Sequence, residues 1–303
     1  MNRLAEPTRN RPRPATHPTT SEGIPMTTTQ ASDDNPGRVN HDALPAINPE
    51  LAGRTVVVTG AGRGMGALFL EELARRGVNG VGGDLDQEEM ASVAEKINAR
   101  LAGTSGAGRV VGVGADVTDP AAGDELVATA LREFGRLDLW VNNAGVFPQA
   151  GFTDITPQQL ALTYGVNVNG VVYGGQAAAR HFRTVGGGAI VNMSSVAAVR
   201  ARPTRAAYNS SKAAVRHLTT CMAVELGPDN IRVNSIAPGY IDTEMTRWIR
   251  EDQAAMDRAL TTVPLRRIGA PMEVFAALYF LLSDSARYIT GVSIPVDGGS
   301  QHV

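Results

Sequence analysis

From residue 51 onward, short apolar runs rich in β-branched residues alternate with longer Ala-rich stretches that have helical periodicity. This alternation is typical of βαβ units, which build a parallel sheet covered by helices on both faces. Strands are predicted at residues 54–59, 78–83, 110–114, 137–141, 189–193, 232–236 and 292–296. Helices are predicted at residues 65–76, 87–101, 120–134, 166–182, 207–226 and 272–283, with short helices within 244–260.

The predicted fold class is therefore α/β, with a single Rossmann-type, doubly wound, parallel seven-stranded sheet. Residues 50–303 are ample for one buried core of this kind. Residues 1–49 are rich in Pro, Thr, Asn, Asp and Arg and poor in apolar residues, so we expect a disordered N-terminal extension. Met26 offers a second possible start of translation, and the sequence leaves both starts open.

Composition and charge narrow the classes of partner. The formal net charge is −2, from 28 basic and 30 acidic residues, which provides no long-range attraction to nucleic acid or to an anionic membrane. The chain contains no apolar run long enough to span a membrane and no apolar segment typical of a signal peptide. Its single cysteine, Cys221, indicates a reducing compartment and is predicted to pack in the core. We expect a cytoplasmic protein with a small-molecule partner, and neither a nucleic-acid nor a membrane partner.

A glycine-rich turn, Thr-Gly-Ala-Gly-Arg-Gly-Met-Gly at residues 59–66, separates the first predicted strand from the first predicted helix. Glycines let the chain turn sharply and let backbone N–H groups approach a pyrophosphate, whose charge the helix N-terminus favours. This position between strand and helix predicts a dinucleotide site. The residues expected to contact the cofactor here are Gly60, Gly62, Arg63, Gly64, Met65 and Gly66.

An acidic residue at the end of the second predicted strand indicates which dinucleotide binds. Asp84, followed by Leu85, stands where a carboxylate accepts hydrogen bonds from the adenosine ribose hydroxyls. A 2′-phosphate there would be repelled, so NAD is predicted over NADP. Arg63 is a contrary signal, because a cation in the turn can reach a 2′-phosphate. Asp86 is a rival for the ribose role, but its place at the start of a helix favours an N-cap.

The candidate reacting groups lie in residues 192–212. Tyr208 and Lys212 are four residues apart and share one face of a helix. To act as a base at neutral pH, a phenol must lower its pKa by about three units, roughly 4 kcal/mol, which a nearby ammonium and a positive nicotinamide ring can supply. Tyr208 would then exchange a proton with the substrate oxygen. Ser195 would hold that oxygen, with Ser194 as the alternative.

Together these residues resemble the short-chain dehydrogenase/reductase family over about residues 51–300. Besides the glycine turn and the Ser195, Tyr208 and Lys212 set, the resemblance rests on Asn142-Asn143-Ala144-Gly145, which in the family stabilises the sheet and lines the cofactor site. It implies a homotetramer or homodimer, with the helices that carry Asn167 and Tyr208 at one interface and the last helix and strand at another.

The resemblance also implies roles for residues outside these motifs. Asn167, rather than Asn169, would link Lys212 to solvent in a proton relay. Asp116 and Val117 would contact the adenine ring. Further cofactor contacts are implied for Asn143, Ala144, Gly145, Tyr208, Lys212, Pro238, Gly239, Ile241 and Thr243.

The predicted function is hydride transfer between NAD(H) and a secondary alcohol or ketone, with Tyr208 as general acid and base. An NADPH-dependent reductase of 3-oxoacyl thioesters or other carbonyls is the alternative; Arg63 favours it and Asp84 disfavours it. A dinucleotide sensor without catalysis is a further alternative, because the fold also supports binding alone. The sequence leaves the substrate and the direction of the reaction open.

The substrate pocket is predicted at residues 146–150, 196–202 and 240–260. The last segment carries large apolar side chains that are candidates for a lid over the substrate. These are Met245, Trp248, Ile249 and Met256.

Overall fold

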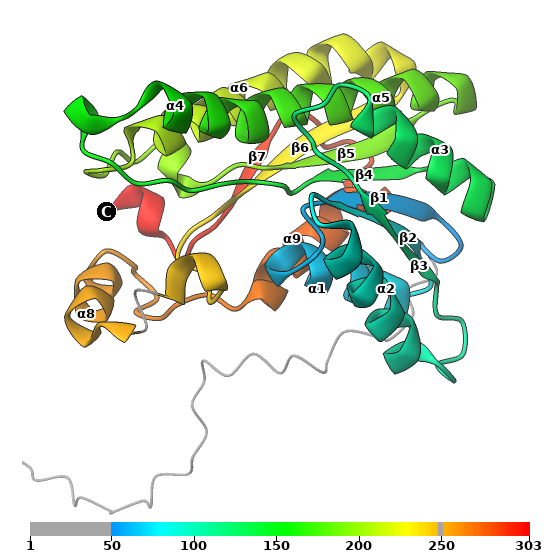
Figure 1. Cartoon of the computed structure of the whole chain (residues 1–303), viewed down its shortest axis with the longest axis horizontal. Helices are drawn as coiled ribbons and strands as arrows, with labels where there is room; N and C mark the ends of the chain where they lie inside the picture. Colours follow the sequence, from blue (N-terminus) through cyan, green and yellow to red (C-terminus); the bar gives the residue numbers. More distant parts are fainter. Residues whose placement is uncertain (1–49, 248–250) are drawn as a thin grey trace, which may run out of the picture. The chain divides into compact units, whose positions relative to one another are not determined.

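A computed structural model describes residues 50–247 and 251–303. Within these ranges seven strands form one parallel sheet, in the order β3-β2-β1-β4-β5-β6-β7 (Figure 1). The predicted doubly wound, Rossmann-type sheet is thus confirmed. The strands are β1 (Thr55–Thr59), β2 (Asn79–Asp84), β3 (Val110–Gly114), β4 (Leu139–Asn142), β5 (Gly188–Met193), β6 (Ile231–Pro238) and β7 (Ser293–Val296).

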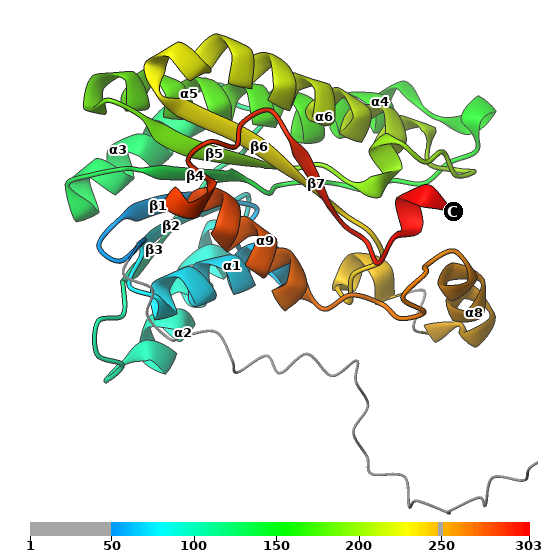
Figure 2. The ribbon, with the colours of Figure 1, turned by 180° about the vertical axis from the view of Figure 1, so that it is seen from behind.

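Helices cover both faces of the sheet (Figures 1 and 2). One face carries α1 (Gly64–Arg75), α2 (Gln87–Leu101) and α9 (Pro271–Leu282). The other carries α3 (Ala122–Phe134), α5 (Gly170–Val185) and α6 (Ala206–Leu226). A shorter helix, α8 (Gln253–Thr261), lies beyond the carboxyl end of the sheet.

Alternate side chains of the central strands supply two hydrophobic cores. Val56 and Val58 of β1 belong to the core beneath α1, α2 and α9, whereas Val57 belongs to the core beneath α3, α5 and α6. Successive side chains of a strand point to opposite faces, so a strand covered on both faces must be apolar throughout. This requirement explains the continuous valine run that predicted the strand.

One helix lies where the sequence analysis placed none. Helix α4 (Pro157–Tyr164) continues through a π-helical turn (Gly165–Asn169) into α5, so the predicted helix at 166–182 is too short at both ends. The Thr156 hydroxyl accepts a hydrogen bond from the Gln159 N–H at 3.1 Å, and the Gln159 side chain accepts one from the Thr156 N–H at 3.0 Å. This capping box, with proline at the first helical position, was a readable start signal that the prediction missed.

The other predicted strands and long helices begin and end within two residues of the observed ones. The prediction for Cys221 is wrong, because this side chain is exposed. The buried stripe of α6 includes Val215, Thr219 and Ala223, which recur every four residues. Cys221 lies outside this stripe. Residues 1–49, Trp248 and Ile249, for which predictions were made above, lie outside the described residues.

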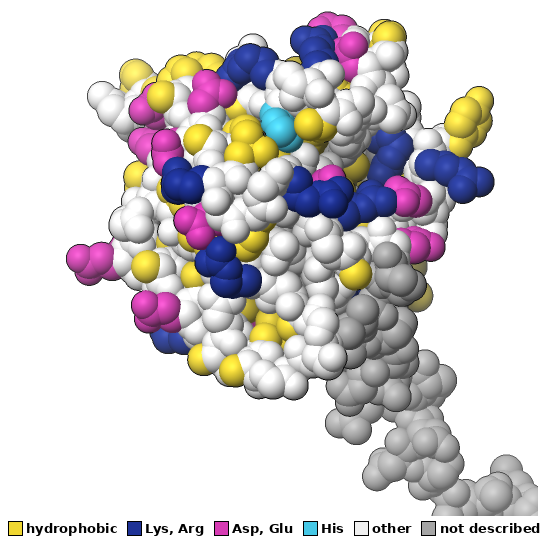
Figure 3. Space-filling view, turned by 90° about the vertical axis from the view of Figure 1, so that its right-hand side faces the viewer, with side chains coloured by type: hydrophobic (Ala, Val, Ile, Leu, Met, Phe, Trp, Pro, Cys, Tyr) yellow, Lys and Arg dark blue, Asp and Glu magenta, His cyan; other side chains and the backbone are white. Residues whose placement is uncertain are grey.

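Charged side chains of both signs are interspersed on the face of the molecule shown in Figure 3. Among the described residues, several charged side chains form exposed ion pairs, such as Arg109 with Glu133 at 3.0 Å and Arg180 with Asp124 at 2.6 Å. Each such pair contributes at most about 1 kcal/mol to stability. In the described ranges, no helix combines the length and the apolar character needed to cross a membrane.

Candidate active site

The carboxyl edge of the sheet brings the candidate residues together. β1 leads into the glycine turn at 60–66, β4 into residues 143–145, β5 into Ser195, and β6 into Gly239. β1 and β4 are neighbours although two strands separate them in sequence, so the strand order reverses between them. In open α/β sheets, ligands bind outside the carboxyl ends of the strands at such a reversal.

Two glycines of the turn have no room for a side chain. Gly60 has φ +64°, and a Cβ there would lie 2.6 Å from the Cα of Ala144. A Cβ on Gly66 would lie 2.2 Å from the carbonyl oxygen of Gly60. The first turn of α1 has neither a side-chain cap nor an acidic residue, so its N–H groups are available to an anion. Met65, in this turn, packs against the core.

Hydrogen bonds between the ends of β1 and β4 hold this cradle in place. The Asn143 side-chain amide donates to the carbonyl oxygens of Thr59 at 3.0 Å and Gly60 at 2.9 Å. In return, the Thr59 hydroxyl accepts from the N–H groups of Asn143 at 3.1 Å and Ala144 at 3.2 Å. The motif at 143–145 therefore fixes the glycine turn from the neighbouring strand.

Asp84 closes the cradle from the side of β2. Its carboxylate accepts hydrogen bonds from the N–H groups of Gly62 and Leu85, both at 2.8 Å. A Cβ on Gly62 would approach the carboxylate carbon to 3.0 Å, so glycine is needed for this contact. Leu85 is 75% exposed and lines an open hollow with Asp84 and Arg63.

The two alternatives to Asp84, Arg63 and Asp86, line the same hollow but differ in their contacts. Arg63 is exposed at the rim of the same hollow. Asp86 caps α2, where its carboxylate accepts from the N–H groups of Glu88 and Glu89 at 3.0 Å. The N-cap predicted for Asp86 is therefore confirmed.

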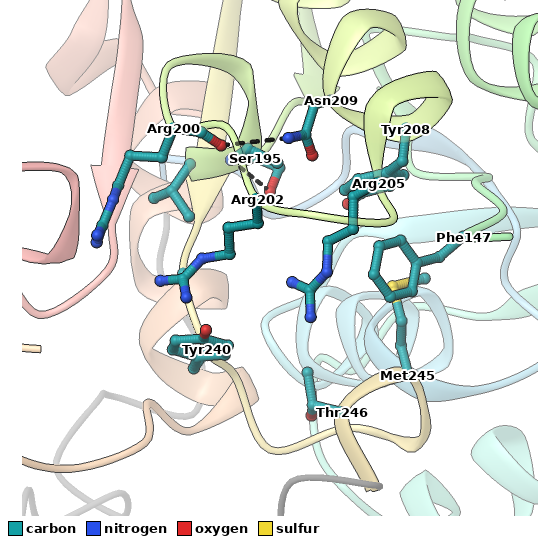
Figure 4. A pocket seen from close by; sticks show the side chains of 13 residues that line it. Phe147, Ser195, Arg200, Arg202, Arg205, Tyr208, Asn209, Tyr240, Met245 and Thr246 are labelled. Atoms are coloured by element: carbon teal, nitrogen blue, oxygen red, sulfur yellow. Dashed lines mark hydrogen bonds between the residues drawn. The ribbon is translucent and has the colours of Figure 1, made fainter. Parts of the chain in front are cut away.

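Tyr208 and Ser195 line one cavity beside this cradle (Figure 4). Tyr208 lies in the first turn of α6, and Ser195 follows β5, with its hydroxyl accepting a hydrogen bond from the Ala197 N–H at 3.1 Å. The neighbouring Ser194 is buried and donates to the Lys212 carbonyl at 3.1 Å. Of the two serines, Ser195 is thus the one that faces the cavity.

Lys212 lies behind Tyr208 on the same helix. Its ammonium group donates to the Met193 carbonyl at 2.8 Å and lies 5.8 Å from the centroid of the Tyr208 ring. Lys212 is 5% exposed, and this burial lowers its pKa from 10.5 to about 8.

Burial also raises the pKa of Tyr208. A hydrogen bond with Ser195 and the charge of Arg205 act in the opposite direction, but burial is the largest influence. The predicted lowering of this pKa by Lys212 is therefore not seen in the protein alone. A phenol that keeps its proton at neutral pH is suited to donate it to a carbonyl oxygen.

Asn167 is fully buried in the π-helical turn, in which the Gly170 N–H donates to the carbonyl of Gly165, five residues back. π-Helical turns of this kind are frequent at functional sites. The Asn167 amide accepts from the Val146 N–H at 2.8 Å and donates to the Val146 carbonyl at 3.0 Å. Asn169, the alternative, is exposed.

Asn167 and Lys212 both lie close to Gly145. A Cβ on Gly145 would lie 3.4 Å from the Asn167 amide oxygen and 3.5 Å from the Lys212 ammonium. The structure thus brings the two predicted relay residues near the same glycine. Asn167 also donates to the Ser211 hydroxyl at 3.0 Å, which ties the π-helical turn to α6.

A buried chain of polar side chains joins the sheet to the helix that carries Tyr208. The Trp140 indole donates to the Asn142 amide at 2.7 Å, and Asn142 donates to Asn192 at 2.9 Å. Asn192 in turn donates to the Thr219 hydroxyl of α6 at 3.0 Å. Satisfied polar chains of this kind hold one arrangement of a core.

The remaining predicted cofactor residues differ in what they can offer. Asp116 is exposed, and its carboxylate accepts a hydrogen bond from the Thr118 N–H at 2.9 Å. Val117 packs closely against Gly170, since a Cβ on Gly170 would lie 2.9 Å from the Val117 side chain. Ile241 is buried in the core, so its backbone is the part left to face a ligand.

The loop after β6 is fixed by backbone contacts. Gly239, after Pro238, donates to the Val296 carbonyl at 2.9 Å and lines the cavity. The Thr243 N–H donates to the Thr246 hydroxyl at 3.1 Å. This loop therefore approaches the cavity from the side opposite α6.

Comparison with known proteins identifies the family. A family model described as enoyl-(acyl carrier protein) reductase matches residues 60–301. The chain is 39% identical over 254 residues to L-rhamnose 1-dehydrogenase (NAD(P)(+)) of Azotobacter vinelandii, covering 82% of this chain and 97% of that protein. The chain belongs to the short-chain dehydrogenase/reductase family.

Other members of the short-chain dehydrogenase/reductase family are similarly related. Trans-4-hydroxycyclohexanecarboxylate dehydrogenase of Sinomonas cyclohexanicum is 37% identical, over 84% of this chain and 95% of that protein. The crystal structure of a gluconate 5-dehydrogenase from Burkholderia cenocepacia, in complex with NADP and tartrate, superposes with a TM-score of 0.77 and 33% identity, covering 84% of this chain and 97% of that chain. These relatives place the chain among oxidoreductases.

In this short-chain dehydrogenase, the cavity beside Tyr208 includes arginines that the sequence analysis did not single out. Phe147 and Met245, from two of the predicted pocket segments, line the cavity. Met256 does not line it, and it is half-buried on α8. The polar side chains of the cavity wall are Ser195, Arg200, Arg202, Arg205, Tyr208, Asn209, Tyr240 and Thr246.

The signal for these arginines was present in the sequence, at positions 200, 202 and 205 between Ser195 and Tyr208. Surface loops also carry arginines, so spacing alone does not tell which of them face a cavity. Figure 4 shows the side chains of Arg202 and Arg205 running from this loop into the cavity, whereas Arg200 points away and donates to the Ser300 carbonyl.

Proposed function

We propose that this protein transfers a hydride between NAD(H) and a secondary alcohol or ketone, with Tyr208 exchanging the proton. The observation that carries the proposal is the meeting of Tyr208 and Ser195 on one cavity wall, with the Lys212 ammonium 5.8 Å from the Tyr208 ring centroid. The relatives named as dehydrogenases of L-rhamnose and of trans-4-hydroxycyclohexanecarboxylate support the same reaction class.

The cofactor site fits a dinucleotide because α1 begins uncapped behind glycines that have no room for side chains. A bound nicotinamide supplies the hydride donor or acceptor. The hydroxyls of Ser195 and Tyr208 would hold the substrate oxygen. During ketone reduction Tyr208 would donate its proton to that oxygen, and Lys212 with Asn167 would return a proton from solvent.

The proposal is tested by following NADH absorbance while the purified protein is given NAD⁺ and a panel of secondary alcohols. The panel should include L-rhamnose, trans-4-hydroxycyclohexanecarboxylate and simple cyclic alcohols, and the matching ketones should be offered with NADH. We expect saturable turnover with at least one of them. A protein that binds NADH yet turns over no member of the panel in either direction would support the dinucleotide-sensor alternative.

We propose NAD as the preferred cofactor because Asp84 lies beside the glycine turn and would repel a 2′-phosphate. In titrations followed by nicotinamide fluorescence, NADH should bind at least about tenfold more tightly than NADPH. Asp84→Asn should reduce this preference. Asp229→Asn is the matched control, because Asp229 pairs with Arg183 just before β6 begins, at the opposite edge of the sheet, and should leave the preference unchanged.

A second candidate function is NADPH-dependent reduction of a carbonyl, such as a 3-oxoacyl thioester. The exposed Arg63 favours it, because this cation lines the same hollow as Asp84. If NADPH binds more tightly than NADH, and Arg63→Ala removes that advantage, the second candidate replaces the first.

We also propose that the protein is a homotetramer or homodimer. Large apolar side chains are exposed on α9 and after it, among them Phe280, Tyr288 and Val292. Light scattering should give a mass of two or four chains, and a monomer would contradict the proposal.

A further inference from the structure

We propose that the substrate carries a carboxylate or similar oxyanion group, which Arg202 and Arg205 bind while Tyr208 faces the reacting alcohol. This inference deepens the proposed function and rests on it. Its basis is the charge of the cavity wall. Of the described residues that line the cavity, none is an aspartate or glutamate, and two arginines, Arg202 and Arg205, extend their side chains into it (Figure 4).

Arg205 stands one aromatic ring away from the catalytic phenol. Its guanidinium lies over the Phe147 ring, 5.1 Å from the centroid, and Phe147 meets the Tyr208 ring edge-on at 4.6 Å. Arg205 is half-buried. A guanidinium held against an aromatic face keeps its N–H groups in a fixed plane, and this fixed geometry suits a carboxylate.

Arg202 reaches the same part of the cavity from the same loop. Its guanidinium lies 5.1 Å from the centroid of the Tyr240 ring and donates to the Thr262 hydroxyl at 3.3 Å. Arg202 therefore lies over the Tyr240 ring, and Arg205 lies beside Arg202 in the cavity (Figure 4). Both cations face the cavity that Tyr208 lines.

Two neighbouring cations in a partly buried site repel each other. Burial lowers the pKa of Arg205 and the charge of Arg202 lowers it as well, whereas Tyr240 and Tyr208 raise it. A substrate oxyanion held by both guanidinium groups would relieve this repulsion, and charge-assisted hydrogen bonds to it would be strong.

The loop that carries both arginines is fixed to α6. The Asn209 amide reaches the Arg200 carbonyl at 3.4 Å (Figure 4). Turned over, the same amide donates to the Arg205 carbonyl at 3.2 Å and accepts from the Arg202 N–H at 3.1 Å, which satisfies both of its polar atoms. In either orientation the residue next to Tyr208 holds the loop, so the cations are positioned relative to the phenol before substrate arrives.

The test compares a carboxylate with its neutral analogue on protein saturated with NADH. Cyclohexanecarboxylate and cyclohexanecarboxamide have nearly the same shape, and calorimetry gives the dissociation constant of each. We expect the carboxylate to bind at least about tenfold more tightly, and Arg202→Gln and Arg205→Gln each to remove most of this advantage while leaving carboxamide binding unchanged. Arg216→Gln, which changes an exposed arginine of α6, is the matched control and should bind both ligands as the unaltered protein does.

Equal affinities for the two ligands, a carboxylate advantage that survives both substitutions, or no saturable binding of either ligand would overturn the inference. The results distinguish a failure of this inference from a failure of the proposed function. If neutral alcohols are turned over as well as hydroxy acids, the hydride-transfer function stands and the anion site does not. If the arginines bind carboxylate but no alcohol is oxidised and no ketone is reduced, the anion site stands and the function fails.

Discussion

At Lys212, an ammonium group lies among buried atoms with the Met193 carbonyl as its hydrogen-bond acceptor at 2.8 Å. Burial favours the neutral amine and lowers the pKa to about 8. At neutral pH Lys212 nevertheless stays charged in the folded protein, so its burial lowers the free energy of unfolding. A charge kept at such a cost is more typical of a functional residue than of a packing residue.

Replacing Lys212 by Met should therefore change how stability depends on pH. Between pH 8 and 10.5 the unfolded chain holds a proton that the folded chain has released, so the free energy of unfolding rises with pH across this window. The rise amounts to about 3 kcal/mol. Lys212→Met lacks it, and its stability relative to the unaltered protein should be greatest below pH 8. Urea unfolding at pH 7 and pH 10 measures the difference; parallel pH profiles for the two proteins would contradict this account.

At the residue scale, the sequence predicts the reacting groups better than it predicts the residues around them. Tyr208 and Lys212 share a helix face, and that spacing holds wherever the helix packs. The choice of Ser195 over Ser194 depends on which of the two hydroxyls donates to the Lys212 carbonyl. In the folded chain this is the Ser194 hydroxyl, a contact that the sequence does not reveal. The role of Arg205 depends on its contact with Phe147, a residue far away in sequence.

At the scale of elements, the turn between β1 and α1 depends on contacts that leave no room for one extra carbon. Gly66→Ala would place a Cβ 2.2 Å from the Gly60 carbonyl oxygen, so the helix must move away from the strand. We expect a loss of stability of about 1 to 3 kcal/mol and weaker NADH binding. Chemical denaturation and fluorescence titration measure the two effects.

Gly227 offers the matched control for that substitution. It has helical dihedral angles at the end of α6, and a Cβ there meets nothing within 4 Å. Gly227→Ala should be neutral or stabilise the protein by up to about 1 kcal/mol, because it restricts the unfolded chain. Equal losses at both glycines would show that close approach in the turn is not the cause.

The boundaries of most elements follow from the sequence because apolar periodicity and turn residues coincide there. Helix α4 was missed because its sequence, Pro157–Tyr164, buries few side chains and has weak periodicity, although Thr156 and Gln159 marked its start. The π-helical turn at Gly165–Asn169 has no such signal. It depends on Asn167 reaching the backbone of Val146 and the hydroxyl of Ser211.

At the scale of the whole molecule, the sheet could be predicted because most of its strands are mainly apolar, which requires helices on both faces. The strand order brings β1 and β4 together, and with them the glycine turn and residues 143–145 of the cradle. The charge of the cavity that Tyr208 lines could not be predicted, since the net charge of −2 averages over the whole surface and conceals the two arginines whose side chains enter the cavity.

We propose that the catalytic domain begins at residue 50, and truncation tests this boundary. Leu51 is fully buried in the core beneath α1 and α9. Removal of residues 1–49 should leave the melting temperature and NADH binding unchanged. Removal of residues 1–52, which also deletes Leu51, should cost about 2 to 5 kcal/mol of stability. A large loss from the shorter deletion would place part of the domain before residue 50.

The most direct test of the account is to compare Tyr208→Phe with the unaltered protein on an alcohol or ketone that the latter turns over. The substitution keeps the ring that meets Phe147 edge-on and removes the hydroxyl that would exchange the proton. We predict that turnover falls by about 10² to 10⁴-fold, while NADH binding, measured by fluorescence, stays within about threefold. Turnover close to that of the unaltered protein, with NADH binding intact, would contradict the central role of Tyr208.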